Sequence, residues 1–195
     1  MRSPPSGWLR RPPSLPSPLR HWLCDRGSLT RRLKSHCQHF SVSLQCAALG
    51  RAPLDETALL GVGSSQHAYL REVLLQCNGT PVVFAHSVLP RASLRGPWNG
   101  ISRLGTRPLG EALFSNPRIH RNALTIRKLS ARHPLFRRIA RLDTPGSVPA
   151  HKTGETASLV LPPHITHLWA RRSVFCLAGR PLLVTEVFLP AIVAP

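Results

Sequence analysis

Two charged side chains occupy positions in the sequence that are otherwise apolar. Glu186 lies in the run GRPLLVTEVFLP, where alternation along a strand would place it on the same face as Val184 and Phe188. Arg71 lies in YLREVLLQC, where the same alternation places it on a stripe of tyrosine, valine and leucine. An arginine and a glutamate on apolar strand faces are therefore the first candidates for chemistry.

An ionised carboxylate without a partner in apolar surroundings costs on the order of several kcal/mol, so Glu186 should face a cation, a donor or a polar ligand. The planar guanidinium group of arginine suits a carboxylate. Arg71 and Glu186 could therefore form a buried ion pair, or they could hold opposite ends of a ligand. Arg71 could also pair with a neighbouring acid such as Glu72. The residues alone leave these alternatives open.

Strand patterns surround both residues. The segment FSVSLQC at residues 40–46 alternates between apolar and polar side chains, which predicts a strand with one buried face. Apolar runs on either side of Asn78-Gly79 predict a hairpin, and residues 168–190 predict a second hairpin that turns near Ala178-Gly179. The segment ALTIRKL at residues 123–129 predicts another short strand.

Two helical pairs are expected between these strands. Residues 18–36 indicate a short helix, a turn at Gly27 and a second helix with Ser28 as its N-cap. Residues 91–117 are interrupted by Gly and Pro, but they contain a helix with Pro108 in its first turn. Helices inserted between hairpins predict an α+β fold with a single antiparallel sheet of about six strands.

The remaining segments are expected to lack regular structure. Residues 1–18 are rich in Pro, Ser and Arg, a composition that predicts a disordered tail ahead of one domain at residues 19–195. A loop is expected around Pro53, Gly61 and Gly63, and an irregular connection at residues 143–158.

The chain carries 26 Lys and Arg against 8 Asp and Glu, a formal net charge of +18. Such a charge favours anionic partners, which include nucleic acid, an acidic membrane surface and anionic metabolites. No apolar run approaches the roughly 20 residues of a membrane-spanning helix, and the N-terminus lacks the apolar core of a signal peptide. A soluble, cytoplasmic protein is expected.

The cysteines indicate neither a disulfide framework nor a zinc ribbon, because they are widely spaced and contain no C-x-x-C pair. His36, Cys37 and His39 could bind a metal but lack a second pair of ligands at usable spacing, so no metal site is expected. Reduced thiols are therefore expected at Cys24, Cys37, Cys46, Cys77 and Cys176.

The alternative function is a basic nucleic-acid or anionic-membrane binding protein without catalysis. Basic clusters at residues 31–34 and 132–141 could form such a footprint. Aromatic residues, however, make up only 6% of the chain, and no known nucleic-acid binding motif is present. Most of these charges are therefore expected to be solvated, with no specific nucleic-acid partner.

Three motifs in one order resemble a known enzyme family. They are the LRE strand in YLREVLLQC, the PLG turn in LGTRPLGEALF, and the strand LLVTEVFLP. In register over roughly residues 20–192, they resemble the chorismate pyruvate-lyase family. The resemblance implies a carbon–oxygen lyase that converts chorismate to 4-hydroxybenzoate and pyruvate, the first committed step of ubiquinone biosynthesis.

The resemblance also implies a fold and a site. A single antiparallel sheet would carry a buried ligand beneath two helical flaps, which correspond to the two helical pairs above. Arg71 would bind a carboxylate and Glu186 would meet the hydroxyl end, as the catalytic residues. Backbone amides of the flaps would bind substrate at Leu29 and Leu109. Leu29 stands where one member of the family has a methionine, a change that a backbone contact tolerates.

Chorismate is the partner that the resemblance implies. Forming an aromatic ring supplies the driving force, so no metal or redox cofactor is expected. The protein is expected to be a monomer. The positive charge would also suit a peripheral contact with an anionic membrane, which the sequence leaves open. The chain departs from the family in its Pro-rich tail, its basic composition and the extra length at residues 130–167. None of these departures involves the four site residues.

Overall fold

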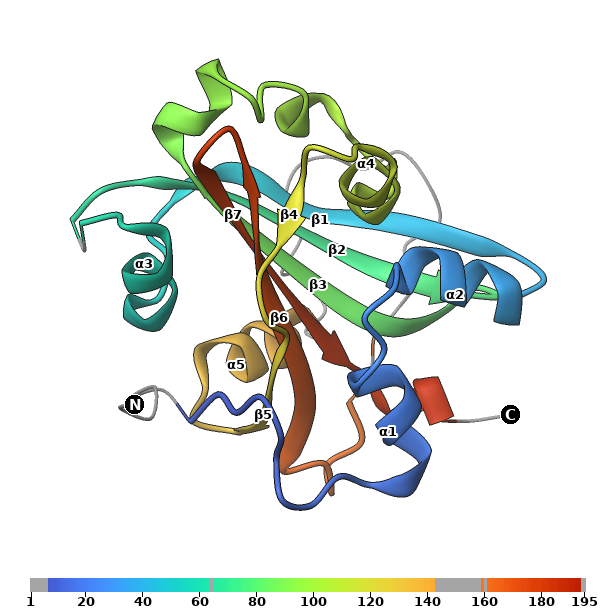
Figure 1. Cartoon of the computed structure of the whole chain (residues 1–195). Helices are drawn as coiled ribbons and strands as arrows, with labels where there is room; N and C mark the ends of the chain where they lie inside the picture. Colours follow the sequence, from blue (N-terminus) through green and yellow to red (C-terminus); the bar gives the residue numbers. More distant parts are fainter. Residues whose placement is uncertain (1–6, 64, 143–158, 160, 194–195) are drawn as a thin grey trace.

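The computed structural model describes residues 7–63, 65–142, 159 and 161–193. In these residues the chain forms an α+β fold with one antiparallel sheet (Figure 1). Its strands are β1 (Phe40–Gly50), β2 (Ala68–Cys77), β3 (Thr80–Pro90), β4 (His120–Arg121), β5 (Thr125–Ser130), β6 (His167–Leu177) and β7 (Arg180–Phe188). The α-helices are α1 (Ser17–Leu23), α2 (Leu29–His36), α3 (Leu54–Leu60), α4 (Leu109–Ser115) and α5 (Pro134–Leu142).

The strands follow the order β1-β2-β3-β7-β6-β4, and β5 also pairs with β6. Each of these pairings is antiparallel. The last strand along the chain, β7, thus lies in the middle of the sheet between β3 and β6. The predicted fold class is confirmed, with a 7-stranded sheet in the described residues rather than about six strands.

Two-residue turns close both predicted hairpins. Asn78 and Gly79 have φ angles of 52° and 81°, and Ala178 and Gly179 have φ angles of 47° and 73°. Positive φ at both central residues is the type I′ geometry, whose twist matches that of the strands it joins. The turns therefore fix the register of β2 with β3 and of β6 with β7.

Two helical flaps cover one face of the sheet, as expected. The first flap consists of α1 and α2, and the second consists of the 3₁₀ helices η1 (Arg91–Arg95) and η2 (Ile101–Arg103) followed by α4. A further 3₁₀ helix, η3 (Pro190–Val193), follows β7. The predicted N-cap is confirmed, because the Ser28 hydroxyl accepts a hydrogen bond from the backbone N–H of Arg31 at 3.3 Å.

The two flaps meet where α2 lies against α4. A Cβ atom built on Gly110 would lie 2.7 Å from Thr30 Oγ1, which is too close for any residue larger than glycine without movement of the neighbour. Lys34 on α2 and Glu111 on α4 also form an ion pair across this junction. The flaps therefore form one continuous cover rather than two separate ones.

The N-terminal segment corrects the prediction of a disordered tail. Trp8 is only 1% exposed, and its Nε1 donates a hydrogen bond to Asp55 at 3.2 Å. Leu9 pairs with Ile126 beside β5 through two backbone hydrogen bonds of 2.9 and 2.8 Å. Residues 7–18 are thus part of the domain, while residues 1–6 lie outside the described residues.

Two further expectations about regular structure need correction. The segment around Pro53, expected as a loop, contains helix α3. The strand predicted at residues 40–46 extends to Gly50, but a register shift between Leu44 and Cys46 interrupts its alternation, and most of residues 40–46 are half-buried. The predicted irregular connection at residues 143–158 lies outside the described residues.

The expectation of reduced thiols is wrong for two cysteines. Cys37, at the C-cap of α2, forms a disulfide with Cys77 at the end of β2, with their Cα atoms 5.3 Å apart. Cys24, Cys46 and Cys176 are free. The described residues contain no group of three or more His, Cys, Asp or Glu side chains suited to a metal, and no helix among them could cross a bilayer.

The opposite face of the sheet carries a buried charged network. His86 on β3 is 2% exposed, and its ring nitrogens lie 3.2 Å from Glu72 Oε1 and 3.1 Å from Glu56 Oε2. Arg138 on α5 donates to the other oxygen of Glu72 at 2.8 Å. Burial alone would lower the pKa of His86, but the two carboxylates outweigh burial and raise this pKa to about 10. A charged histidine therefore connects α3, α5 and the two strands.

We expect this network to make stability depend on pH. The pKa of His86 is about 10 in the folded chain and near 6.5 when unfolded, so its contribution is complete below pH 6.5 and is lost as the pH rises through 10. His86→Gln should lower the free energy of unfolding most at pH 6, with the difference from wild type shrinking toward pH 10. Urea unfolding across this range measures the difference, and a difference independent of pH would contradict the expectation.

The docked N-terminal segment gives a second expectation. Trp8→Ala should lower the free energy of unfolding by about 3 to 5 kcal/mol, because it removes a large buried side chain from the core. Leu9→Ala is the control, since this side chain is 40% exposed and its pairing uses backbone atoms, and it should cost less than about 1 kcal/mol. Equal and small losses in both variants, measured by urea unfolding, would show that the segment does not support the fold.

Candidate functional site

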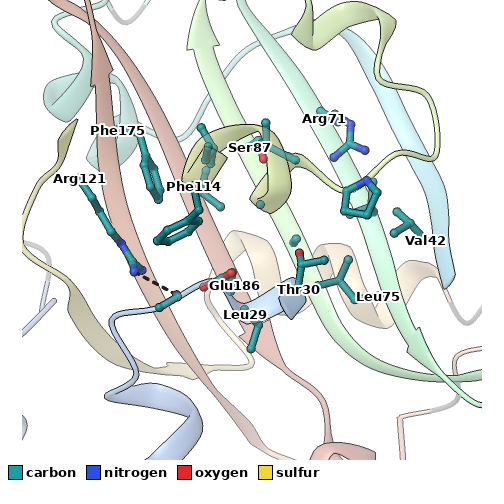
Figure 2. A pocket seen from close by; sticks show the side chains of 18 residues that line it. Leu29, Thr30, Val42, Arg71, Leu75, Ser87, Phe114, Arg121, Phe175 and Glu186 are labelled. Carbon is teal, nitrogen blue, oxygen red and sulfur yellow. Dashed lines mark hydrogen bonds between the residues drawn. The ribbon is translucent and has the colours of Figure 1, made fainter. Parts of the chain in front are cut away.

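A cavity lies between the sheet and the two flaps, and its empty space, including the part open to solvent, is about 570 Å³. Strands β1, β2, β3, β6 and β7 supply most of its apolar wall, and the first turns of α2 and α4 cover it (Figure 2). The structure brings together all four predicted site residues, since the lining includes Leu29, Arg71, Leu109 and Glu186.

Arg71 reaches from β2 into this cavity and is 2% exposed. Its Nη2 donates hydrogen bonds to the backbone carbonyls of Gly105 at 3.0 Å and Arg107 at 2.9 Å, in the loop before α4. Among the described residues, its Nε has no hydrogen-bond partner and no carboxylate forms an ion pair with it. Burial lowers the pKa of the guanidinium group. Arg71 therefore holds the second flap and keeps donor capacity for a ligand.

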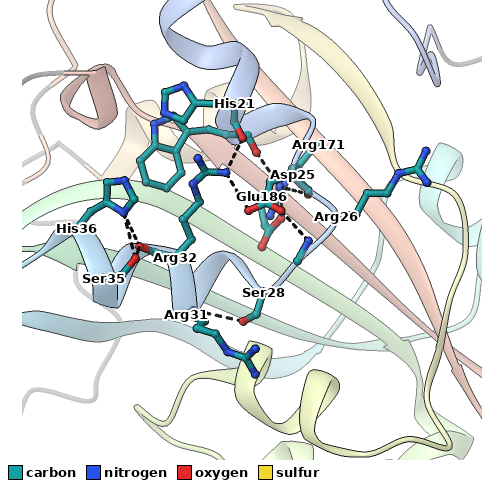
Figure 3. Close-up of polar contacts among 12 residues, drawn as sticks. His21, Asp25, Arg26, Ser28, Arg31, Arg32, Ser35, His36, Arg171 and Glu186 are labelled. Atoms are coloured by element: carbon teal, nitrogen blue, oxygen red, sulfur yellow. Dashed lines mark hydrogen bonds and ion pairs between the residues drawn. The ribbon is translucent and has the colours of Figure 1, made fainter.

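Glu186 projects from the middle of β7, and its partner is Arg171 on β6 (Figure 3). The two residues are directly opposite in the β6–β7 register, and Arg171 Nε donates to Glu186 Oε2 at 2.5 Å. Arg171 is fully buried, and its Nη1 also donates to the carbonyls of Trp22 and Asp25, each at 2.7 Å. The suspected ion pair between Arg71 and Glu186 is therefore absent.

The pairing of Arg71 with Glu72 is also excluded. Glu72 points to the opposite face, where it contacts His86 and Arg138. The partner of Glu186 was missed in the sequence although a signal existed: counting outwards from the turn at Ala178-Gly179 places Arg171 opposite Glu186. Of the alternatives left open, the geometry retains the one in which Arg71 and Glu186 face a shared cavity.

Comparison with known families adds to this geometry. The sequence profile of the family described as chorismate lyase matches residues 8–194. The chain belongs to the chorismate lyase family. The match covers the cavity, both flaps and the docked segment that begins before the domain boundary expected at residue 19.

Two relatives are similar to this chain in sequence over almost its whole length. A protein from Thiobacillus denitrificans named probable chorismate pyruvate-lyase is 50% identical over 189 residues, which cover 97% of this chain and 91% of that protein. A protein of the same name from Nitrosomonas europaea is 45% identical over 190 residues, covering 97% of each.

Solved structures resemble this chorismate lyase family member in fold at low sequence identity. PhnF from Mycobacterium smegmatis has a TM-score of 0.52 and 17% identity, covering 85% of this chain and 65% of that chain. A PhnF C-terminal domain also has a TM-score of 0.52, with 13% identity over 81% of this chain and 87% of that domain. These likenesses concern the fold alone.

In this chorismate lyase family member, the two predicted backbone donors occupy equivalent places in the flaps. Leu29 is the first residue of α2, and Leu109 is the first residue of α4. The N–H groups in the first turn of a helix have no intrahelical acceptor, so both remain available to a ligand. Both residues are buried at the edge of the cavity.

Sequence reasoning missed one further cavity residue, Arg121 on β4. Its Nε donates to Ser173 Oγ at 2.9 Å, and its Nη1 donates to the carbonyl of Arg26 at 2.7 Å in the turn of the first flap. Its guanidinium carbon lies 5.6 Å from the ring centroid of Phe114 and 5.3 Å from that of Phe175. Strand β4 has only 2 residues, so no alternation pattern could indicate this residue.

The buried pair of Arg171 and Glu186 can be tested by removing one partner and then both. Arg171→Met should lower the free energy of unfolding by about 3 to 5 kcal/mol, because it leaves a carboxylate without its cation. The double variant with Glu186→Leu should recover part of this loss, because only the bonds to the carbonyls of Trp22 and Asp25 then remain missing. Glu186→Gln alone keeps an acceptor for Arg171 and should cost less. Urea unfolding of the three variants measures the coupling, and additive losses in the double variant would contradict it.

Proposed function

We propose that this protein is a chorismate lyase, which cleaves chorismate to 4-hydroxybenzoate and pyruvate and so supplies 4-hydroxybenzoate to ubiquinone biosynthesis. The observation that carries the proposal is a buried arginine, Arg71, in a flap-covered cavity without a carboxylate partner among the described residues. Such an arginine needs an anionic ligand to offset its burial. The named relatives supply the identity of that ligand, which is chorismate.

The reaction suits a site that holds charge and excludes water. The ring carbon that bears the hydroxyl loses its proton, the ether C–O bond breaks, and the enolpyruvyl methylene gains a proton to give pyruvate. The ring becomes aromatic, which supplies the driving force without a redox change. The protein must hold the anion in a reactive conformer and stabilise the charge that develops on the ether oxygen.

Each proposed site residue has a place in this scheme. Arg71 binds the ring carboxylate, and Glu186, oriented by Arg171, accepts a hydrogen bond from the ring hydroxyl. Backbone N–H groups of Leu29 and Leu109 bind the substrate from the two flaps. The apolar lining around them strengthens these interactions because it lowers the local dielectric constant.

The rival function, a basic nucleic-acid or anionic-membrane binding protein without catalysis, has no support in the family match or in the names of the relatives. Peripheral contact with an anionic membrane, a monomeric state and a cytoplasmic location stay predictions, as does turnover without a cofactor.

The direct test is to mix the purified protein with chorismate alone and to follow 4-hydroxybenzoate and pyruvate. Equal amounts of both products should appear, and chelation should not reduce the rate. Arg71→Ala should reduce kcat/KM by roughly 100-fold or more, and Arg71→Lys should recover part of it, because a point charge replaces a planar fork. Glu186→Gln should keep the fold and lose turnover. Normal turnover by both Arg71→Ala and Glu186→Gln would overturn the site assignment.

A further inference from the structure

The cavity carries more positive charge than one carboxylate can balance. Its ionisable lining residues in the described chain are Arg71, Arg121 and Glu186, and the carboxylate of Glu186 is already paired with Arg171. Neither arginine of the lining forms an ion pair with a carboxylate of the described residues. A ligand with two anionic groups would neutralise both.

The two cations lie on opposite sides of the cavity. Arg71 is on β2 and Arg121 is on β4, and the strands between them are β3, β7 and β6. Figure 2 shows the two side chains on either side of Glu186. A ligand that spans them would place one end near each arginine and its middle near Glu186.

Arg121 is oriented as a binding group would be. The rings of Phe114 and Phe175 support its guanidinium group, and Ser173 fixes its Nε. Among the described residues, Nη2 has no hydrogen-bond partner and Arg121 forms no ion pair. Burial and the charge of Arg171 lower the pKa of Arg121, while the charges of Glu186 and Asp25 raise it.

We propose that Arg121 binds the enolpyruvyl carboxylate of chorismate, the group that leaves as pyruvate. The assignment rests on the proposed function and follows from the shape of the substrate. With the ring carboxylate at Arg71, the ring hydroxyl at the far end of the ring meets Glu186. The enolpyruvyl ether is on the ring carbon next to that hydroxyl, so its carboxylate extends from the Glu186 end of the cavity toward Arg121.

The same residue links substrate binding to the cover of the site. Arg121 donates to the carbonyls of Arg26 at 2.7 Å and Gly27 at 3.5 Å, in the turn that leads into α2. An anion on Nη2 would hold the guanidinium group in place and with it this turn of the first flap. The substrate therefore has a contact with the first flap that 4-hydroxybenzoate, which has lost the second carboxylate, cannot make.

The test compares the substrate with the product. Arg121→Gln should lower kcat/KM for chorismate by roughly 10- to 100-fold and change the Kd for 4-hydroxybenzoate by less than about threefold. Arg121→Lys should recover part of kcat/KM, because it keeps the charge without the planar fork. Arg71→Lys should weaken the binding of both ligands, since both carry the ring carboxylate.

Two control variants separate this role from simpler ones. Arg118→Gln removes an exposed positive charge nearby and should leave both ligands almost unaffected, which excludes a general attraction of the dianion. Arg32 does not line the cavity, and it holds the first flap through contacts with the His21 carbonyl and Asp25. Arg32→Ala removes these contacts and should affect the binding of both ligands equally.

The outcomes are distinguishable. Equal losses for chorismate and 4-hydroxybenzoate in Arg121→Gln, or an unchanged kcat/KM, would overturn the proposal. If Arg121→Gln does not fold, kcat/KM for chorismate and Kd for 4-hydroxybenzoate are compared in Arg121→Lys instead. Equal losses for the two ligands, or an unchanged kcat/KM, would then overturn the proposal. A wild-type protein that does not turn over chorismate would overturn the proposed function and this assignment with it.

Discussion

The contact between Arg171 and Glu186 is the interaction on which the rest of the site depends. A carboxylate in the central strand would be costly without a cation, and Arg171 supplies that cation from the neighbouring strand at 2.5 Å. The same guanidinium group donates to the carbonyls of Trp22 and Asp25, which positions the first flap over the sheet. Arg171 therefore holds both the Glu186 carboxylate in the cavity and the first flap that covers it.

Strand register controls which charges reach the cavity. Consecutive residues on β2, Arg71 and Glu72, point to the cavity and to the buried network on the opposite face. On β3, Ser87 likewise points to the cavity and His86 points to the buried network on the opposite face. Because side chains alternate, a shift of one residue would exchange the two sets. The type I′ turn at Asn78-Gly79 thus protects the electrostatics of the site as well as the hydrogen bonding of the sheet.

The sequence predicted what depends on local patterns and missed what depends on distant contacts. Turn residues and alternation indicated both hairpins, and the family motifs indicated Arg71 and Glu186. Trp8 was missed because nothing in a Pro-rich segment shows that a tryptophan docks on a core formed by other strands. The disulfide between Cys37 and Cys77 was missed because the pairing of β1 with β2 brings the two residues together over 40 positions.

The central position of β7 also has a consequence for synthesis of the chain. The ribosome makes this strand after β1 to β6, yet it joins β3 to β6. Its pairing partners on β3 lie about a hundred residues earlier, as in Val83 with Phe188. Until β7 emerges, the nascent chain carries two unpaired strand edges, which are prone to pair with other chains. Premature termination before residue 180 would therefore remove Glu186 and also leave β3 and β6 without the strand that joins them.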